Sequence, residues 1–262
     1  RSRGLGDVYK RQILFSVTFC KSKKTSKQTE KAVATSQIQL VKAPSSPNYF
    51  DSELNLSDID LTPKDTSYLV NFSFDVKNYE LGVLTRDAND RGIANSEKGQ
   101  HIHLILNNEP YSAHYNPSAQ KILSRGQYVV LAFLSRSYHE SVKNENSFTL
   151  TTFDTGSSKK SNKFDEKGQH MFYSRPKGTY KGSDISKLLL DFFLVNVTLD
   201  PKGNKVRATI NGEIFMIDEW APYYIQGLQP GILTVKLELL NTDGFVIEGP
   251  FNDVTRSVIL SE

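Results

Sequence analysis

Cysteine is almost absent from this chain of 262 residues, since Cys20 is the only one. A single thiol excludes a disulfide framework and any zinc or iron–sulfur site built from several cysteines. No uninterrupted apolar run reaches the roughly 18 residues that predict a membrane-spanning helix. The 16 glycines and 10 prolines are too few for a collagen-like or low-complexity chain. What remains is a globular protein, long enough for one large domain or two of ordinary size.

The net charge of +3 is unevenly distributed along the chain. Residues 1–31 carry nine basic side chains against Asp7 and Glu30, which leaves residues 32–262 with a net charge of −4. Binding of nucleic acid needs a basic face on the folded domain itself. The mildly acidic body therefore argues against a nucleic-acid partner.

The N-terminal part shows no sustained period of two or 3.6 residues. Residues 1–12 resemble translated sequencing adapter, and they predict no part of the fold. Residues 13–20 are a short apolar run that ends at Cys20, which is typical of a truncated lipoprotein signal with a lipidated cysteine, although Phe19 stands where such signals favour a small residue. The alternative is a free cysteine in a clipped secretory signal. Residues 21–67, rich in Lys, Ser, Thr and Gln, predict a disordered tether.

The body contains two copies of one unit, and both alternate apolar and polar residues as β-strands do. The parallel stretches are 76–81 with 194–199, 98–107 with 202–211, and 123–134 with 228–239. A lone sheet of this size would leave one apolar face bare, so each copy predicts a two-layer sandwich. The expected fold is all-β, with two tandem immunoglobulin-like β-sandwich modules: module 1 at 68–155, a linker at 156–187 and module 2 at 188–262.

The repeat also predicts which side chains face each core. In the second copy the inward set is Val206, Ala208, Ile210, Val235, Leu237 and Leu239, and in the first it is Ile102, Leu104, Leu106, Val130, Ala132 and Leu134. Three apolar residues of the first copy then point outward where the second has Thr, Lys and Glu, namely Val129, Leu131 and Phe133. Such a stripe predicts that something packs against it: either the second module or the linker, or a partner or ligand.

The same register places His101 and His103 on the outer face of one strand, where the second copy has Lys205 and Arg207. Two histidines at i and i+2 point to the same side and can ligate copper or zinc, with His114 or His139 completing the site. The alternative is a polar, solvated pair, which the aligned Lys205 and Arg207 favour. The loop 85–92 has oxygen-bearing side chains but lacks calcium-site spacing, so we interpret it as a loop.

Two segments mix aromatic and basic residues and form the second candidate site, for phosphate, carboxylate, sugar or peptide. Its residues are Tyr115, Arg136, Tyr138, His139, Tyr173, Arg175, Lys177 and Tyr180. If both segments project from the junction of the modules, they could line one cleft. No nucleophile elbow, phosphate-binding loop or zinc-protease motif is present, so we predict no enzymatic activity and no cofactor.

From Asn71 onward the chain is similar to a family of Gram-negative bacterial envelope lipoproteins of unestablished role, often labelled phosphopeptide-binding proteins. The resemblance rests on residues 98–103 (KGQHIH), 110–115 (PYSAHY), 130–141 (VLAFLSRSYHES), 172–180 (FYSRPKGTY) and 206–212 (VRATING). It implies a lipid-anchored protein located at the outer membrane or in the periplasm. We therefore expect a non-enzymatic binding or interaction protein whose partner is a protein, a plain or phosphorylated peptide, or a glycan. The alternative is a periplasmic copper- or zinc-binding protein that uses His101, His103 and His114.

Overall fold

The computed structural model describes residues 37–156 and 164–262. Within these ranges the regular structure is β-strand, apart from two short 3₁₀ turns, Ala88–Asp90 and Gly182–Ser186. The described residues form one compact unit by their internal contacts. The expected adapter, lipoprotein signal and Cys20 lie outside the described residues, as does the tether up to residue 36.

Module 1 is a sandwich of two antiparallel sheets. One sheet has the strand order β2-β3-β6 and the other β5-β4-β7-β8. The strands are β2 (Glu53–Pro63), β3 (Ser67–Lys77), β4 (His101–Leu106), β5 (Ser112–His114), β6 (Ser118–Ser124), β7 (Gln127–Ser135) and β8 (Phe148–Asp154). Side chains from both sheets share one apolar core that includes Phe72, Ile102 and Val130.

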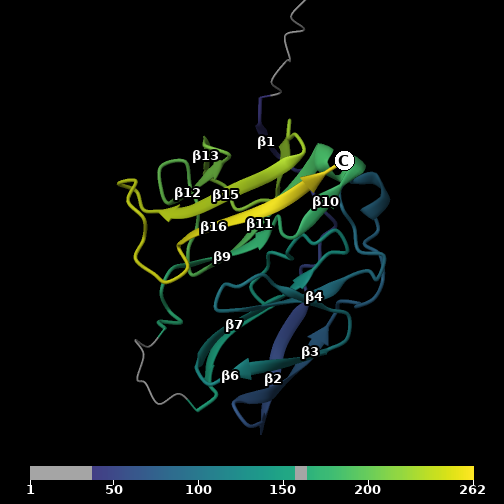
Figure 1. The fold of residues 1–262 in the computed structure, drawn as a ribbon, viewed down its shortest axis with the longest axis vertical. Coiled ribbons are helices and arrows are strands. Elements are labelled where there is room, and N and C mark those ends of the chain that lie inside the picture. The colour runs from purple at the N-terminus through teal and green to yellow at the C-terminus, as the bar shows by residue number, and fades with distance from the viewer. Residues whose placement is uncertain (1–36, 157–163) are drawn as a thin grey trace, which may run out of the picture. The chain divides into compact units, whose positions relative to one another are not determined.

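Module 2 is a second sandwich, with sheet orders β1-β14-β11-β9 and β10-β16-β15-β12-β13. Its strands are β1 (Gln39–Lys42), β9 (His170–Arg175), β10 (Thr179–Lys181), β11 (Lys187–Val195), β12 (Lys205–Ile210), β13 (Glu213–Ile217), β14 (Tyr223–Gln226), β15 (Gly231–Leu240) and β16 (Asp253–Ser261). In Figure 1, β2, β3 and β6 lie together, and β12, β15 and β16 lie together. Two tandem β-sandwiches, as the sequence predicts, are confirmed.

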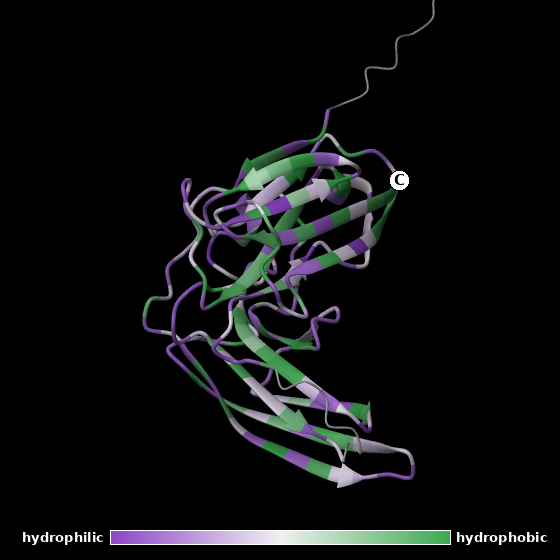
Figure 2. Cartoon of the chain, turned by 90° about the vertical axis from the view of Figure 1, so that its left-hand side faces the viewer, coloured by the Kyte–Doolittle hydropathy of each residue, from purple (hydrophilic) through white to green (hydrophobic). Residues whose placement is uncertain are grey.

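The repeat extends to matching turns. Asn107 and Asn211 both have positive φ, and each accepts a backbone N–H on its Oδ1 at 2.8 Å, from Val129 and Thr234 respectively. Asparagine tolerates the left-handed conformation because its short amide bonds locally. The predicted inward residues lie in the two cores, with Leu106 half-buried at the edge of its own. Figure 2 shows the alternation of hydrophobic and hydrophilic residues along several of these strands.

Two predicted boundaries are wrong. Residues 37–67 do not belong to a disordered tether, because β1 pairs with β14 in module 2 and β2 pairs with β3 in module 1. The expected linker also contains strands, since β9 pairs with β11 and β10 runs parallel to β16. Backbone pairing with a neighbouring strand orders both segments although their own hydrophobic patterns are weak.

The outward stripe of β7 is covered by module 2, as the first of its two interpretations predicts. Val129, Leu131 and Phe133 join Phe172 and Phe193 in a separate buried cluster between the modules. The Phe133 and Phe193 rings stack with centroids 4.8 Å apart. On β15 of module 2 the residue aligned with Phe133 is Glu238, which pairs with Arg207 instead. The junction between the modules is therefore the molecule's third apolar core.

Candidate metal centre

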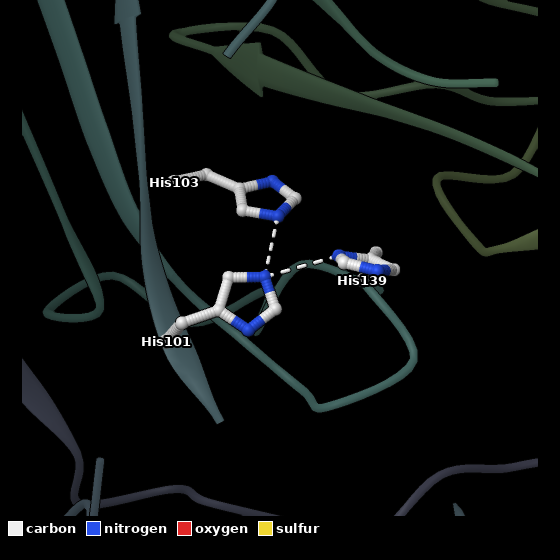
Figure 3. Close-up of side chains that lie close together, drawn as sticks. All are labelled: His101, His103 and His139. Carbon is white, nitrogen blue, oxygen red and sulfur yellow. Dashed lines mark hydrogen bonds between the residues drawn. The ribbon is translucent and has the colours of Figure 1, made fainter. Parts of the chain in front are cut away.

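Three histidines of module 1 converge at this junction, on the side of the β4–β7 sheet that faces away from the module's own core (Figure 3). His101 and His103 come from β4, and His139 comes from the turn after β7. The His101 Nε2 atom lies 2.9 Å from His103 Nε2 and 3.1 Å from His139 Nδ1. The ligand atoms of all three rings lie within 4.8 Å of one another.

His139 reaches the cluster because the chain leaves the strand before it. β7 ends at Ser135, and the His139 N–H then donates to the Arg136 carbonyl at 2.8 Å, which closes a tight turn. His139 has a φ of 69°, in the left-handed region that few residues other than glycine adopt. Alternation along a continuous strand, which would place His139 by counting residues from β7, therefore does not apply to it.

The expectation that the His101 and His103 imidazoles face water is wrong. Both residues have no exposed surface. Their register is as predicted, but the face they occupy is covered: the Tyr111 ring stacks on His103 with centroids 3.5 Å apart, and Ser174 Oγ of module 2 lies 3.4 Å from His103 Nδ1. The aligned Lys205 and Arg207 could not reveal this, because no second module covers their sheet.

His114 does not join the cluster, contrary to the predicted ligand set. It pairs across the sheet with Ile102, whose side chain lies in the core of module 1, and directly opposite residues of an antiparallel pair share a face. His103 pairs instead with Ala113 and Phe133, on the opposite face. The His114 Nε2 atom lies 2.8 Å from Ser112 Oγ.

Burial keeps the clustered imidazoles neutral. Desolvation, more than any other cause, lowers the pKa of His101 to about 4 and holds the pKa values of His103 and His139 well below the ordinary value. The positive charges of Arg175 and Lys177 act in the same direction. Neutral imidazole is the form that binds a metal ion.

The hydrogen bonds fix the tautomer of His101 and direct its lone pair at the other two rings. His101 Nδ1 lies 2.8 Å from the Gly99 carbonyl, which can only accept, so this nitrogen carries the proton and Nε2 holds a lone pair. That single lone pair faces two ring nitrogens, from His103 and His139, and can accept one good hydrogen bond. A backbone carbonyl that fixes the tautomer behind a converging nitrogen is the usual support of a metal-binding histidine.

The residues of the second candidate site are divided. Tyr115, Arg175 and Lys177 surround the cluster: the Tyr115 ring lies 5.0 Å from His101, and the two cations lie over the ring of Tyr111, a residue the sequence analysis missed. Tyr180 accepts a hydrogen bond of 2.7 Å from Arg175 Nη1. Burial lowers the pKa of Lys177 to about 8 and raises that of Tyr111.

His139 belongs to the cluster itself, whereas Arg136, Tyr138 and Tyr173 lie elsewhere and are buried. Arg136 forms an ion pair of 3.1 Å with Glu140, and Tyr173 packs in the core of module 2. Tyr138, Arg175 and Tyr180 do share a cavity, so the two aromatic–basic segments meet there. The cavity has a volume of about 10 Å³, however, which is room for about one water molecule rather than a peptide or a glycan.

Comparison with known proteins gives distant structural neighbours only. No family model and no curated protein matches the chain. Among solved structures it is similar to the fibronectin(III)-like modules of Clostridium thermocellum CbhA (14% identity, 74% of this chain and 85% of that one, TM-score 0.28). It is also similar to the two tandem V-type regions of VCBP3, a v-region-containing chitin binding protein (7%, 80% and 99%, TM-score 0.23), and to the FN1–FN3 domains of chicken CNTN1 (12%, 80% and 65%, TM-score 0.23).

Proposed function

We propose that this chain is a non-enzymatic binding protein whose ligand is a transition-metal ion held by His101, His103 and His139. The observation that carries the proposal is the convergence of three neutral ring nitrogens, two of them 2.9 Å apart, at a buried junction. Imidazole nitrogens suit copper and zinc, the metals that the sequence suggested. A peptide or glycan ligand receives less support, because the aromatic–basic segments meet at a cavity of about 10 Å³.

The test is metal titration of the apoprotein, purified without a histidine tag, with Zn²⁺ and Cu²⁺ in separate calorimetric experiments. We expect one ion per chain. His139→Asn removes one ligand while keeping a residue that tolerates positive φ, so affinity should fall by about 100-fold. His114→Asn is the matched control, because His114 lies outside the cluster, and its affinity should equal that of the parent. Binding that is absent, or that both variants weaken equally, refutes the proposal.

We propose the bacterial cell envelope as the place where the protein works, with Cys20 lipidated. Support comes from the apolar run that ends at Cys20 and from the family resemblance. Between residues 37 and 156 and from 164 to 262 there is no helix with the length and hydropathy that a bilayer span requires. The complete gene product, expressed in a Gram-negative host fed an alkyne fatty acid, should incorporate the label, and Cys20→Ser should abolish it. Equal labelling of both contradicts lipidation.

A further inference from the structure

Tyr111 places a fourth donor atom beside the three histidines. Its side chain is buried, and its Oη lies 3.3 Å from His139 Nδ1. Three consecutive distances therefore link the four atoms: 2.9 Å from His103 Nε2 to His101 Nε2, 3.1 Å from His101 Nε2 to His139 Nδ1, and 3.3 Å from His139 Nδ1 to Tyr111 Oη. Ligand atoms at about 2.0–2.1 Å from a tetrahedral metal are roughly 3.3 Å apart, so these three gaps are close to the edges of such a site.

The charges around the cluster call for an anionic ligand. Among the described residues the metal-ligating group contains histidines and no carboxylate. Lys177 Nζ lies 4.0 Å and Arg175 Cζ 5.4 Å from the centre of the Tyr111 ring, and neither cation takes part in an ion pair that the described ranges contain. A divalent ion bound by neutral rings alone would add two positive charges to this desolvated region, at a large electrostatic cost.

Both cations are also placed to stabilise an oxygen anion on Tyr111. Arg175 is 9% exposed, donates from Nη1 to Tyr180, and has no hydrogen-bond partner for its Nε among the described residues. Lys177 Nζ donates to the Tyr111 carbonyl, which holds the ammonium close to the phenol ring. Tyr111 is thus the group at the cluster that can supply negative charge where positive charge is in excess.

Taking the proposed metal function as its basis, we infer that Tyr111 is the fourth ligand and binds as a phenolate, with Arg175 and Lys177 as positioning residues. On binding, the Oη–H bond breaks, the proton passes to solvent, and Oη donates its electron pair to the metal, whose oxidation state does not change. A site of three imidazoles and one phenolate is harder than a thiolate site, and it favours Cu²⁺ or Zn²⁺ over Cu⁺.

The experiment is a Cu²⁺ titration of the full chain, followed by visible absorption and by calorimetry. A copper-bound phenolate gives an intense ligand-to-metal charge-transfer band, which imidazole ligands alone do not give. We expect this band in the parent protein. In Tyr111→Phe the stack on His103 is kept and Oη is lost, so the band should vanish while one Cu²⁺ still binds, about 10-fold to 100-fold more weakly.

Tyr115→Phe is the matched control, because Tyr115 also lies beside His101 but its hydroxyl bonds to Ser96, and it should keep the band. Lys177→Met removes a cation from the phenolate, so its band should move to longer wavelength without loss of copper. Copper binding without the band in the parent protein, or a band that survives in Tyr111→Phe, overturns the assignment of Tyr111 and leaves the metal function intact. Absence of copper and zinc binding overturns both.

Discussion

At the scale of single residues, two buried polar groups in the equivalent strand pairs β4–β7 and β12–β15 have opposite surroundings. His103 on β4 lies among rings, 5.1 Å from Phe133, and desolvation disfavours its charged form. Glu238 on β15 is 6% exposed but receives two hydrogen bonds from Arg207, at 2.7 and 2.8 Å, and one of 3.0 Å from Lys236. The first environment favours a neutral ligand, and the second favours a carboxylate that stays ionised.

Glu238 gives a prediction about acid stability. Its hydrogen bonds from Arg207, and then from Lys236, lower its pKa from 4.5 to about 2 in the folded protein. A carboxyl group whose pKa is depressed by folding contributes stability above its unfolded pKa and loses it as the pH falls. Glu238→Gln should therefore lower the free energy of unfolding at pH 7 by about 1–2 kcal/mol, and this difference should shrink between pH 4.5 and 2.

Urea unfolding across that pH range, followed by circular dichroism, measures the effect of Glu238→Gln. Glu213→Gln on β13 is the control, because Glu213 forms none of the ion pairs found in the described ranges, and it should change stability little at any pH. A Glu238→Gln deficit that stays constant from pH 7 to pH 2 contradicts the ion-pair explanation.

At the scale of strands, what could be predicted followed from an unbroken alternation. β12 alternates buried and half-buried residues along its whole length, and the repeat carries its register to β4. Both β4–β7 and β12–β15 pair without a bulge and in the aligned register, Leu106 with Val130 and Ile210 with Val235. β2 breaks the pattern, because a bulge between Leu56 and Asp58 shifts its register against β3. One inserted residue exchanges the inward and outward faces of the strand. Leu54 and Ile59 therefore do not fit a single alternating pattern in the sequence.

Other elements have no hydrophobic pattern from which they could be predicted. β1 has four residues, of which Leu40 alone is half-buried, and it is held by its pairing with β14, about 180 residues away. The candidate site has the same limitation. His101 and His103 could be found from their spacing, but His139 depends on a turn with positive φ, and Tyr111 depends on how the segment before β5 folds back over β4.

At the scale of the whole molecule, a buried ion pair joins the modules next to the apolar junction. Asp191 of β11 has no exposed surface. It accepts hydrogen bonds from Lys143 Nζ at 2.6 Å, from Ser141 Oγ at 3.0 Å and from the Ser141 N–H at 3.2 Å. Lys143 Nζ also lies 5.8 Å from the ring of Trp220, the only tryptophan, which packs on the junction.

Removing one partner of this pair should separate its role from that of an ordinary surface pair. Asp191→Ala leaves the Lys143 ammonium, whose side chain is only 14% exposed, without its counter-charge, so the free energy of unfolding should fall by about 3 kcal/mol. The double variant Asp191→Ala with Lys143→Met removes the stranded charge and should recover a large part of that loss. Glu53→Ala, which breaks the exposed pair with Lys77, should cost no more than about 1 kcal/mol.

Urea unfolding followed by Trp220 fluorescence measures the stability of the parent protein and of these three variants at the junction itself. If the double variant is no more stable than Asp191→Ala, the cost belongs to lost packing and to the Ser141 hydrogen bonds, because a stranded lysine charge would have been relieved.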